Sequence, residues 1–207
     1  MLNLFSLNMI SEVLKNLAYL YYPKNICPWT QKDLYIETVE YKRLKVLIEH
    51  FDSDGNQEVR NNIKTEFDKD SVLKDFQDFS RLDNEDRCCT FFLNVIEGGE
   101  LCSIILYMSI LVPYYVIGII IHKNQMIIPR SRIEELEKEN LDPRKIKDLV
   151  LEVENIVEKK FLYSKFPKEI LNDKFEDISF QDSYIGEFKM FNAFFNNQVV
   201  YLEKDDN

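Results

Sequence analysis

Three carboxylates stand close together just before the first long apolar run of the chain. Asp83, Glu85 and Asp86 lie between Arg81 and Arg87. Paired carboxylates serve as general acids and bases, but that role needs a nucleophile or a histidine nearby, and neither is close in the sequence. The pattern favours a solvated acidic loop, and its functional interpretation is a rim that contacts a protein partner.

The histidines and cysteines show no spacing typical of metal binding or catalysis. His50 and His122 are the two histidines, and neither has a serine or cysteine at an informative spacing. The four cysteines, Cys27, Cys88, Cys89 and Cys102, form no CxxC pair. We therefore predict no metal site. Four unpatterned cysteines are typical of a protein in a reducing cytoplasm.

Loops that bind calcium or phosphate are also missing from the sequence. Residues 52–58 carry several acidic side chains, but a calcium loop that begins at Asp52 would need glycine at Gln57 and glutamate at Ile63. A solvated turn at Asp54-Gly55 is the simpler interpretation. The chain has five glycines and contains no GxGxxG, Walker or GxSxG motif. We expect a protein that is not an enzyme and that needs no cofactor.

The composition of the chain says more about the charge of a binding partner than about catalytic chemistry. The formal net charge is −10, from 36 acidic and 26 basic side chains. An acidic surface repels nucleic acid and anionic lipid and favours a basic partner. Two alanines and five glycines beside abundant Asn, Lys and Ile follow AT-rich codons, which indicates a bacterial source. The N-terminus is apolar but has no basic region or cleavage site, so we expect no signal peptide and a cytoplasmic location.

The strongest structural prediction is a β-hairpin over residues 87–109 at the centre of one α+β domain, residues 1–207. Gly98-Gly99 joins two apolar runs, and this dipeptide is a strong signal for a two-residue turn. That turn places Val95 opposite Cys102. One face of the hairpin is then wholly apolar: Cys89, Phe91, Leu93, Val95, Cys102, Ile104, Leu106 and Met108.

Residues 114–128 extend the antiparallel sheet. The apolar run 114–121 predicts a third strand, followed by a turn and a short fourth strand at 126–128. Pro113 must lie at a bend or an edge, because proline donates no hydrogen bond to a ladder.

A transmembrane helix over residues 101–121 is the alternative, since this stretch carries no charge and a spanning helix needs about 20 apolar residues. Basic residues follow it. Pro113 in mid-span, the β-branched content and the matching strand before the turn favour the sheet.

Amphipathic helices from both ends of the chain are expected to pack on this sheet. In the N-terminal part, an apolar stripe predicts a helix that ends at Pro23: Ile10, Val13, Leu14, Leu17, Leu20 and Tyr21. Residues 23–36 form an irregular linker with the sole tryptophan, Trp29. A second helix follows at 38–50, with Val39, Leu44, Leu47, Ile48 and Phe51 inward, and a weaker one over 59–67.

The C-terminal part contains the best helix signal, over residues 143–161. Asp142 can cap it, Pro143 suits its first position, and its stripe is continuous from Ile146 to Val157. Ser131 and Glu134 have capping-box spacing, which predicts a short helix at 132–138. The aromatic tail suits a helix over 185–195, and residues 201–202 could instead close as a strand.

Two stretches carry a resemblance to a known class of proteins. They are Tyr21-Tyr22-Pro23-Lys24-Asn25-Ile26, followed by Tyr35 and Glu40-Tyr41-x-x-Leu44, and Ser109-Ile110-Leu111-Val112-Pro113-Tyr114-Tyr115. They resemble uncharacterised bacterial immunity proteins of polymorphic or contact-dependent toxin systems. The resemblance implies a binding protein that neutralises a cognate toxin and implies no catalytic residues.

We therefore expect a cytoplasmic interaction protein that binds a basic toxin domain and no nucleic acid. Acidic charge speeds association with such a partner, and aromatic anchors supply affinity. The candidate partner-binding residues are Trp29, Asp83, Glu85, Asp86, Tyr114 and Tyr115. Two other functions stay open. One is an enzyme of unrecognised type, with a pocket that gathers carboxylates and His50 or His122. The other is a membrane-associated factor that uses residues 101–121.

Overall fold

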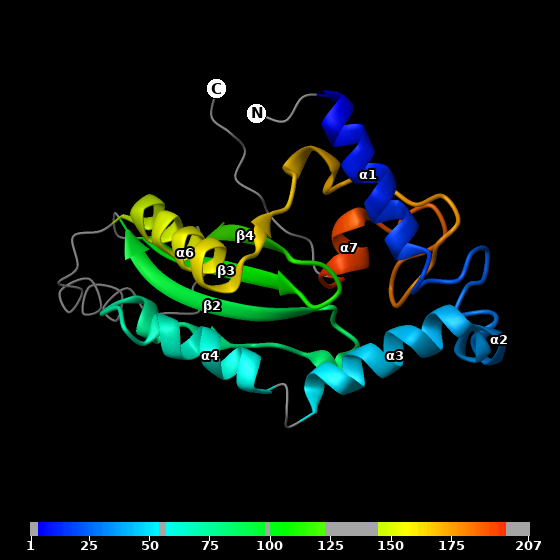
Figure 1. The fold of residues 1–207 in the computed structure, drawn as a ribbon, viewed down its shortest axis with the longest axis horizontal. Helices are drawn as coiled ribbons and strands as arrows, with labels where there is room; N and C mark the ends of the chain where they lie inside the picture. Colours follow the sequence, from blue (N-terminus) through cyan, green and yellow to red (C-terminus); the bar gives the residue numbers. More distant parts are fainter. Residues whose placement is uncertain (1–3, 54–56, 98–99, 123–144, 198–207) are drawn as a thin grey trace.

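A central five-stranded sheet with helices on both faces gives the chain the expected α+β fold (Figure 1). The computed structural model describes residues 4–53, 57–97, 100–122 and 145–197. The strands lie in the order β1-β2-β3-β4-β5; β1 to β4 pair antiparallel, and β5 pairs parallel with β4. Their bounds are β1 Gln77–Asp78, β2 Cys88–Glu97, β3 Glu100–Ser109, β4 Tyr114–Ile121 and β5 Ser164–Lys165.

The register of the β2–β3 hairpin is the predicted one. Val95 lies opposite Cys102, and Ile96 lies opposite Leu101. The eight side chains predicted to share one face are all buried, and all belong to the same core cluster. The turn residues Gly98 and Gly99 themselves lie outside the described residues.

Residues 101–121 form strands rather than a membrane-spanning helix. They make up most of β3 and β4, and the bend at 110–113 between these strands contains Pro113. Within the described ranges, no helix is long and apolar enough to cross a membrane.

The long helices follow the predicted periodicity, with changes at their ends. A short helix at Lys32–Glu37 corrects the expectation that residues 23–36 form an irregular linker throughout. Thr38 caps the start of α3, because its hydroxyl oxygen accepts a hydrogen bond from the Tyr41 backbone N–H at 3.3 Å. The last long helix begins at Ile146, and the Asp148 carboxylate accepts a hydrogen bond from the Lys145 backbone N–H just before it. The prediction had placed the start of this helix at residue 143. The bounds are α1 Leu4–Ala18, α2 Lys32–Glu37, α3 Val39–Asp52, α4 Gln57–Phe67, α6 Ile146–Phe161 and α7 Met190–Phe194. Three short 3-10 turns are η1 Leu73–Asp75, η2 Leu82–Asn84 and η3 Lys168–Ile170.

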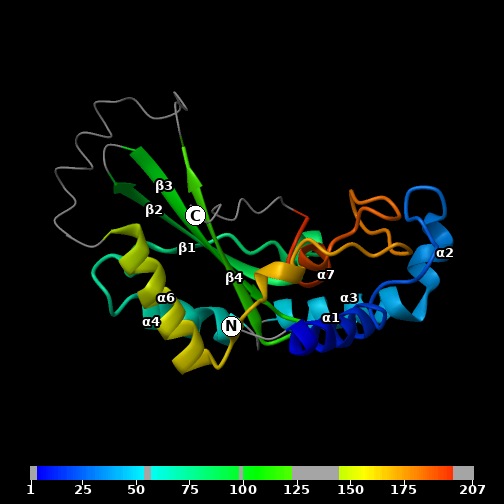
Figure 2. The same ribbon diagram turned by 90° about the horizontal axis from the view of Figure 1, so that it is seen from above.

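Each face of the sheet has its own core. The face predicted to be apolar packs against α4, η1 and α6. The opposite face packs against α1, α3 and the aromatic segment 166–195. Figure 2 shows α4 and α6 toward the hairpin end of the sheet, and α1, α2, α3 and α7 gathered toward the other end. The second core therefore lies where β2 begins and β3 ends.

Several expectations for single helices were wrong in detail. Val13, Leu20 and Val39 were assigned to inward faces, but their side chains are exposed. Within the predicted helix 185–195, only α7 is helical, and residues 166–189 run largely as irregular chain across the second core. The reason is tertiary: rings of this segment bury themselves against the sheet without needing a helical period.

Some predictions concern segments that the structure does not describe. They are the turn at Asp54-Gly55, the strand at 126–128, the helix at 132–138, the cap by Asp142 with Pro143, and the strand at 201–202.

The apolar face of the hairpin should dominate stability. Leu106 is fully buried on β3, so Leu106→Ala should lower the free energy of unfolding by about 2–5 kcal/mol. Val46→Ala, at a site on α3 that is 66% exposed, is the control and should change it by less than about 0.5 kcal/mol. Urea denaturation measures both. Equal effects of the two substitutions would contradict the observed packing.

Candidate partner-binding site

A fully buried arginine joins the sheet to the C-terminal segment. Arg87 directly precedes β2, and its side chain has no exposed surface. Its Nε donates to the Asn192 carbonyl oxygen at 3.1 Å. Its Nη1 donates to the Glu85 carbonyl oxygen at 2.7 Å and to Gln181 Oε1 at 2.9 Å. These bonds hold η2, the Gln181 turn and α7 around one guanidinium.

The remaining contacts of Arg87 complete this arrangement without a carboxylate. Nη2 donates to the Asn192 carbonyl oxygen and to Asn197 Oδ1, the latter at 3.2 Å. The guanidinium carbon lies 5.0 Å from the centroid of the Phe180 ring, a cation–π contact. Within the described part of the chain, no carboxylate forms an ion pair with Arg87. Neutral acceptors alone satisfy this buried charge.

Trp29 lies between two hollows that adjoin this arginine. Its side chain is 58% exposed, and it lines both hollows together with Gln181. The aromatic hollow has a volume of about 250 Å³ and is lined by Pro28, Trp29, Lys32, Tyr35, Ile36, Tyr41, Glu85, Phe180 and Gln181. The polar hollow has a volume of about 420 Å³ and is lined by Trp29, Arg81, Asn84, Asp86, Gln181, Asp182 and Asn197.

One lining residue of each hollow has a buried polar atom without a hydrogen-bond partner. These atoms are Tyr35 Oη, from the aromatic hollow's lining, and Asn197 Nδ2, from that of the polar hollow. Among the described residues, these two side chains are the ones with a buried unpaired nitrogen or oxygen. An unpaired buried group of this kind costs about 1–3 kcal/mol.

Glu85 is held by α3 rather than presented to solvent. Its backbone is left-handed, with φ of 62°, and its Oε1 accepts the Tyr41 hydroxyl at 2.6 Å. Lys45 Nζ lies 3.4 Å from the same oxygen. Burial and the bond to Glu85 raise the pKa of Tyr41. Glu85 thus lines the aromatic hollow with its carboxylate already engaged.

Asp83 and Asp86 lie in one turn but differ in solvent exposure. Asp83 is exposed on η2. Asp86 is half-buried in the polar hollow, and burial raises its pKa to about 6, opposed by the Arg87 and Arg81 guanidinium groups. The structure brings Trp29, Glu85 and Asp86 together at the two hollows, as residues of one predicted surface would require, with Asp83 in the turn that precedes Asp86.

Tyr114 and Tyr115 do not belong to this site. Tyr115 is fully buried, and its hydroxyl donates to Glu158 Oε1 at 2.8 Å, on the side of the sheet that α6 covers. Tyr114 packs edge-on against Phe166, with ring centroids 5.4 Å apart. Neither residue lines either of the two hollows. Tyr115 has no exposed surface in this structure, and the role of Tyr114 and Tyr115 in partner binding stays a prediction.

Sequence reasoning did not connect the C-terminal segment with the acidic turn. Gln181, Asp182 and Asn197 line the polar hollow, yet they lie about a hundred positions from η2. One available signal was Arg87 itself, because a charged residue at the start of a buried strand requires acceptors from elsewhere in the chain.

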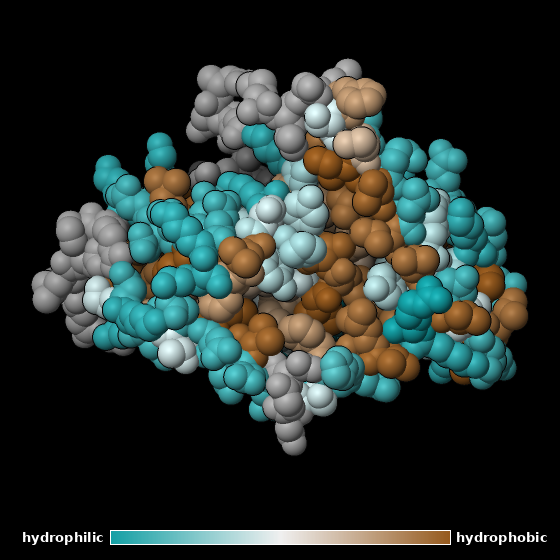
Figure 3. Space-filling model, in the orientation of Figure 1, coloured by the Kyte–Doolittle hydropathy of each residue, from teal (hydrophilic) through white to brown (hydrophobic). Residues whose placement is uncertain are grey.

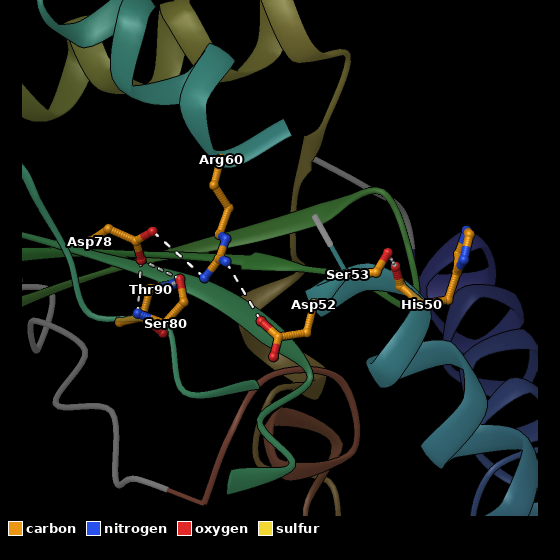
Figure 4. Close-up of polar contacts among 7 residues, drawn as sticks. All are labelled: His50, Asp52, Ser53, Arg60, Asp78, Ser80 and Thr90. Atoms are coloured by element: carbon orange, nitrogen blue, oxygen red, sulfur yellow. Dashed lines mark hydrogen bonds and ion pairs between the residues drawn. The ribbon is translucent and has the colours of Figure 1, made fainter. Parts of the chain in front are cut away.

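Neither histidine lies in these hollows. Arg60 forms two ion pairs close to the end of α3: its Nη2 lies 3.5 Å from Asp52 Oδ1, and its Nη1 lies 3.9 Å from Asp78 Oδ2. The ring of His50, two residues before Asp52, points away from this group (Figure 4). The Ser53 hydroxyl donates to the backbone oxygen of His50, not to its ring. This constellation therefore lacks the geometry of a catalytic triad.

His122 does contact a serine, at the hairpin end of the sheet. Its Nε2 lies 2.8 Å from Ser103 Oγ. The Ser103 hydroxyl, however, donates its proton to Asn94 Oδ1 at 2.6 Å, so His122 must donate to Ser103 in this arrangement. A nucleophile needs the reverse direction. The three side chains make a polar row across the strands.

The described residues contain no candidate metal cluster, and Cys88 and Cys89 are buried thiols. No group of three or more His, Cys, Asp or Glu side chains there could hold a metal ion. Burial raises the pKa of the Cys88 and Cys89 thiols, which makes them poor nucleophiles.

An apolar surface over α1 is a second exposed feature. Figure 3 shows hydrophobic residues gathered over this helix and toward α3. Phe5, Met9 and Val13 lie four residues apart on α1 and are each more than half exposed. None of them lines the hollows around Trp29.

Comparison with known proteins does not assign the site, because no family model, no curated protein and no solved structure matches the chain. Its function must therefore be inferred from its own geometry and charge.

Arg87 should be essential for the architecture of this site. Arg87→Met leaves the Asn192, Gln181 and Asn197 oxygens without their donor, so we expect a loss of at least about 3 kcal/mol in the free energy of unfolding. Arg81→Met removes an exposed guanidinium six residues earlier and should change it by less than about 0.5 kcal/mol. Denaturant titration compares them. Similar small effects would show that the buried arginine is dispensable.

Asp86 should make stability depend on pH in a defined direction. Its folded pKa, about 6, is above the ordinary value of 3.8, so the folded state binds the proton more tightly. The stability gained from this proton is present below the ordinary pKa and is lost as pH rises through about 6. Asp86→Asn should therefore be more stable than the unmodified chain near pH 7, with a smaller difference near pH 4.

Thermal or urea unfolding at both pH values measures this difference, and Asp83→Asn is the control for removing an exposed carboxylate from the same turn. A stability gain for Asp86→Asn that is larger near pH 4 than near pH 7 would have the wrong sign.

Proposed function

We propose that this chain is a non-enzymatic interaction protein, an immunity protein that binds and neutralises a basic toxin domain through the surface around Trp29. The observation that carries the proposal is the placement of Trp29. The sole tryptophan of the chain is 58% exposed between two hollows, beside the acidic turn. Tryptophan is enriched among the residues that dominate binding energy in protein interfaces.

Charge supports a basic partner. The chain has a net charge of −10, and three carboxylates line the hollows: Glu85, Asp86 and Asp182. Asp83 adds an exposed negative charge in the same turn. Such a surface accelerates encounter with a positively charged domain and disfavours nucleic acid. The resemblance of residues 21–44 and 109–115 to immunity proteins supports the same function.

Rigid support makes this surface suitable for binding. Trp29 lies in an irregular segment, but the residues beneath it are anchored to the sheet through Arg87 and to α3 through Glu85. A surface held in its binding conformation loses little conformational entropy on association.

The partner to test first is the product of the gene next to this one, because an immunity protein is normally encoded beside its toxin. Trp29→Ala should weaken binding of that protein by at least about 2 kcal/mol, or roughly thirtyfold. Asp83→Lys with Asp182→Lys should mainly slow association and reduce its dependence on salt. Surface plasmon resonance with the purified pair measures both effects, and a growth assay measures protection.

Matched controls lie on α6, which covers the opposite side of the sheet. Leu151→Ala removes an apolar side chain that is 50% exposed, and Glu152→Lys reverses an exposed charge. Both should bind and protect as the unmodified chain does. Full binding by Trp29→Ala, or equal losses in the α6 variants, would refute the proposed surface.

A further inference from the structure

We infer that the two hollows form one receptor for an arginine side chain of a peptide or protein partner, with its stem in the aromatic hollow and its guanidinium in the polar hollow. Because the arginine belongs to a protein, this receptor rests on the proposed function and names the chemistry that the site recognises.

The order of the two hollows matches the shape of this side chain. They adjoin at Trp29 and Gln181, so a single extended side chain can reach from one into the other. Arginine buries an apolar stem along hydrophobic surface while its charged head stays among polar groups. The aromatic hollow, at about 250 Å³, is below the usual size of a small-molecule site and suits one side chain.

Aromatic rings provide the apolar surface against which the arginine stem can pack. Tyr35 packs against Tyr41 with ring centroids 5.3 Å apart and against Phe180 at 6.3 Å. Trp29 lines the opening with its ring largely exposed. Of these rings, Trp29 also lines the polar hollow, and a planar guanidinium stacks on an aromatic ring more readily than the compact ammonium of lysine does. Phe180 already holds the Arg87 guanidinium in this way.

Carboxylates in the polar hollow supply acceptors for the head. Asp86 is half-buried there and makes no side-chain hydrogen bond within the described residues, and Asp182 lies exposed beside it. Lys32 and Arg81 also line the hollows, but both are exposed, so their charged ends can extend into water. The half-buried charge in the polar hollow is thus the negative one.

The probe for the test is N-acetyl-arginine N-methylamide, with the citrulline analogue as its neutral isostere. Trp29 is the sole tryptophan, so its fluorescence reports on this site alone. The arginine probe should perturb Trp29 fluorescence and shift the side-chain amide signals of Gln181 and Asn197 in NMR spectra. It should bind about tenfold more tightly than the citrulline probe.

The pH dependence gives an independent readout. A bound cation favours ionised Asp86, because burial and, to a smaller extent, Asp83 raise its pKa to about 6 against the opposing charges of Arg87 and Arg81. The preference for arginine over citrulline should therefore shrink as pH falls below about 6. Asp86→Asn with Asp182→Asn should abolish the preference at all pH values, and Glu152→Gln on α6 should preserve it.

Three results would overturn the receptor: equal binding of the two probes, perturbation confined to residues outside the hollows, or stronger binding of N-acetyl-glutamate N-methylamide than of the arginine probe. These outcomes are distinct from failure of the proposed function. If the toxin binds through another surface, the probe titration still gives the predicted preference for arginine. If the site does not bind the arginine probe, binding of the toxin can still be measured separately.

Discussion

The buried guanidinium of Arg87 is the constraint on which the second half of the molecule depends. A charge without exposed surface must be surrounded by acceptors, and here the acceptors are neutral oxygens from Glu85, Gln181, Asn192 and Asn197. These residues come from η2, from an irregular turn and from α7 and its end. One side chain thereby fixes where the C-terminal segment crosses the sheet and where the floor of the polar hollow lies.

The same constraint explains why the site is acidic at its rim and cationic beneath. Arg87 lies behind Gln181 and Asn197, and its field lowers the pKa of Asp86 while burial raises it more. Burial therefore makes Asp86 easier to protonate than an exposed aspartate. In the receptor that we propose, the arginine of a partner would oppose this effect, which links the architecture of the fold to the chemistry of recognition.

The β2–β3 hairpin could be predicted in detail because its signals are local, whereas the short edge strands β1 and β5 were not predicted. Gly98-Gly99 and the alternating apolar pattern determine the register between neighbouring strands, and the structure has that register. Trp29 and the acidic turn were also recognisable as surface features from residue type. Tyr114 and Tyr115 lie away from the hollows, because α6 covers Tyr115 and Phe166 packs against Tyr114, and alternation along a strand shows neither contact. The hollows were beyond prediction, since their residues join two segments about a hundred positions apart through one buried side chain.

Amide hydrogen exchange on Arg87→Met tests the organising role of this arginine most directly. If Arg87 holds the C-terminal segment on the sheet, amides of α7 and of residues 175–191 should lose protection by a factor of about ten or more, while those of β3 beneath α4 and α6 keep most of theirs. Unchanged protection in the C-terminal segment, or an equal loss throughout the sheet, would contradict the account.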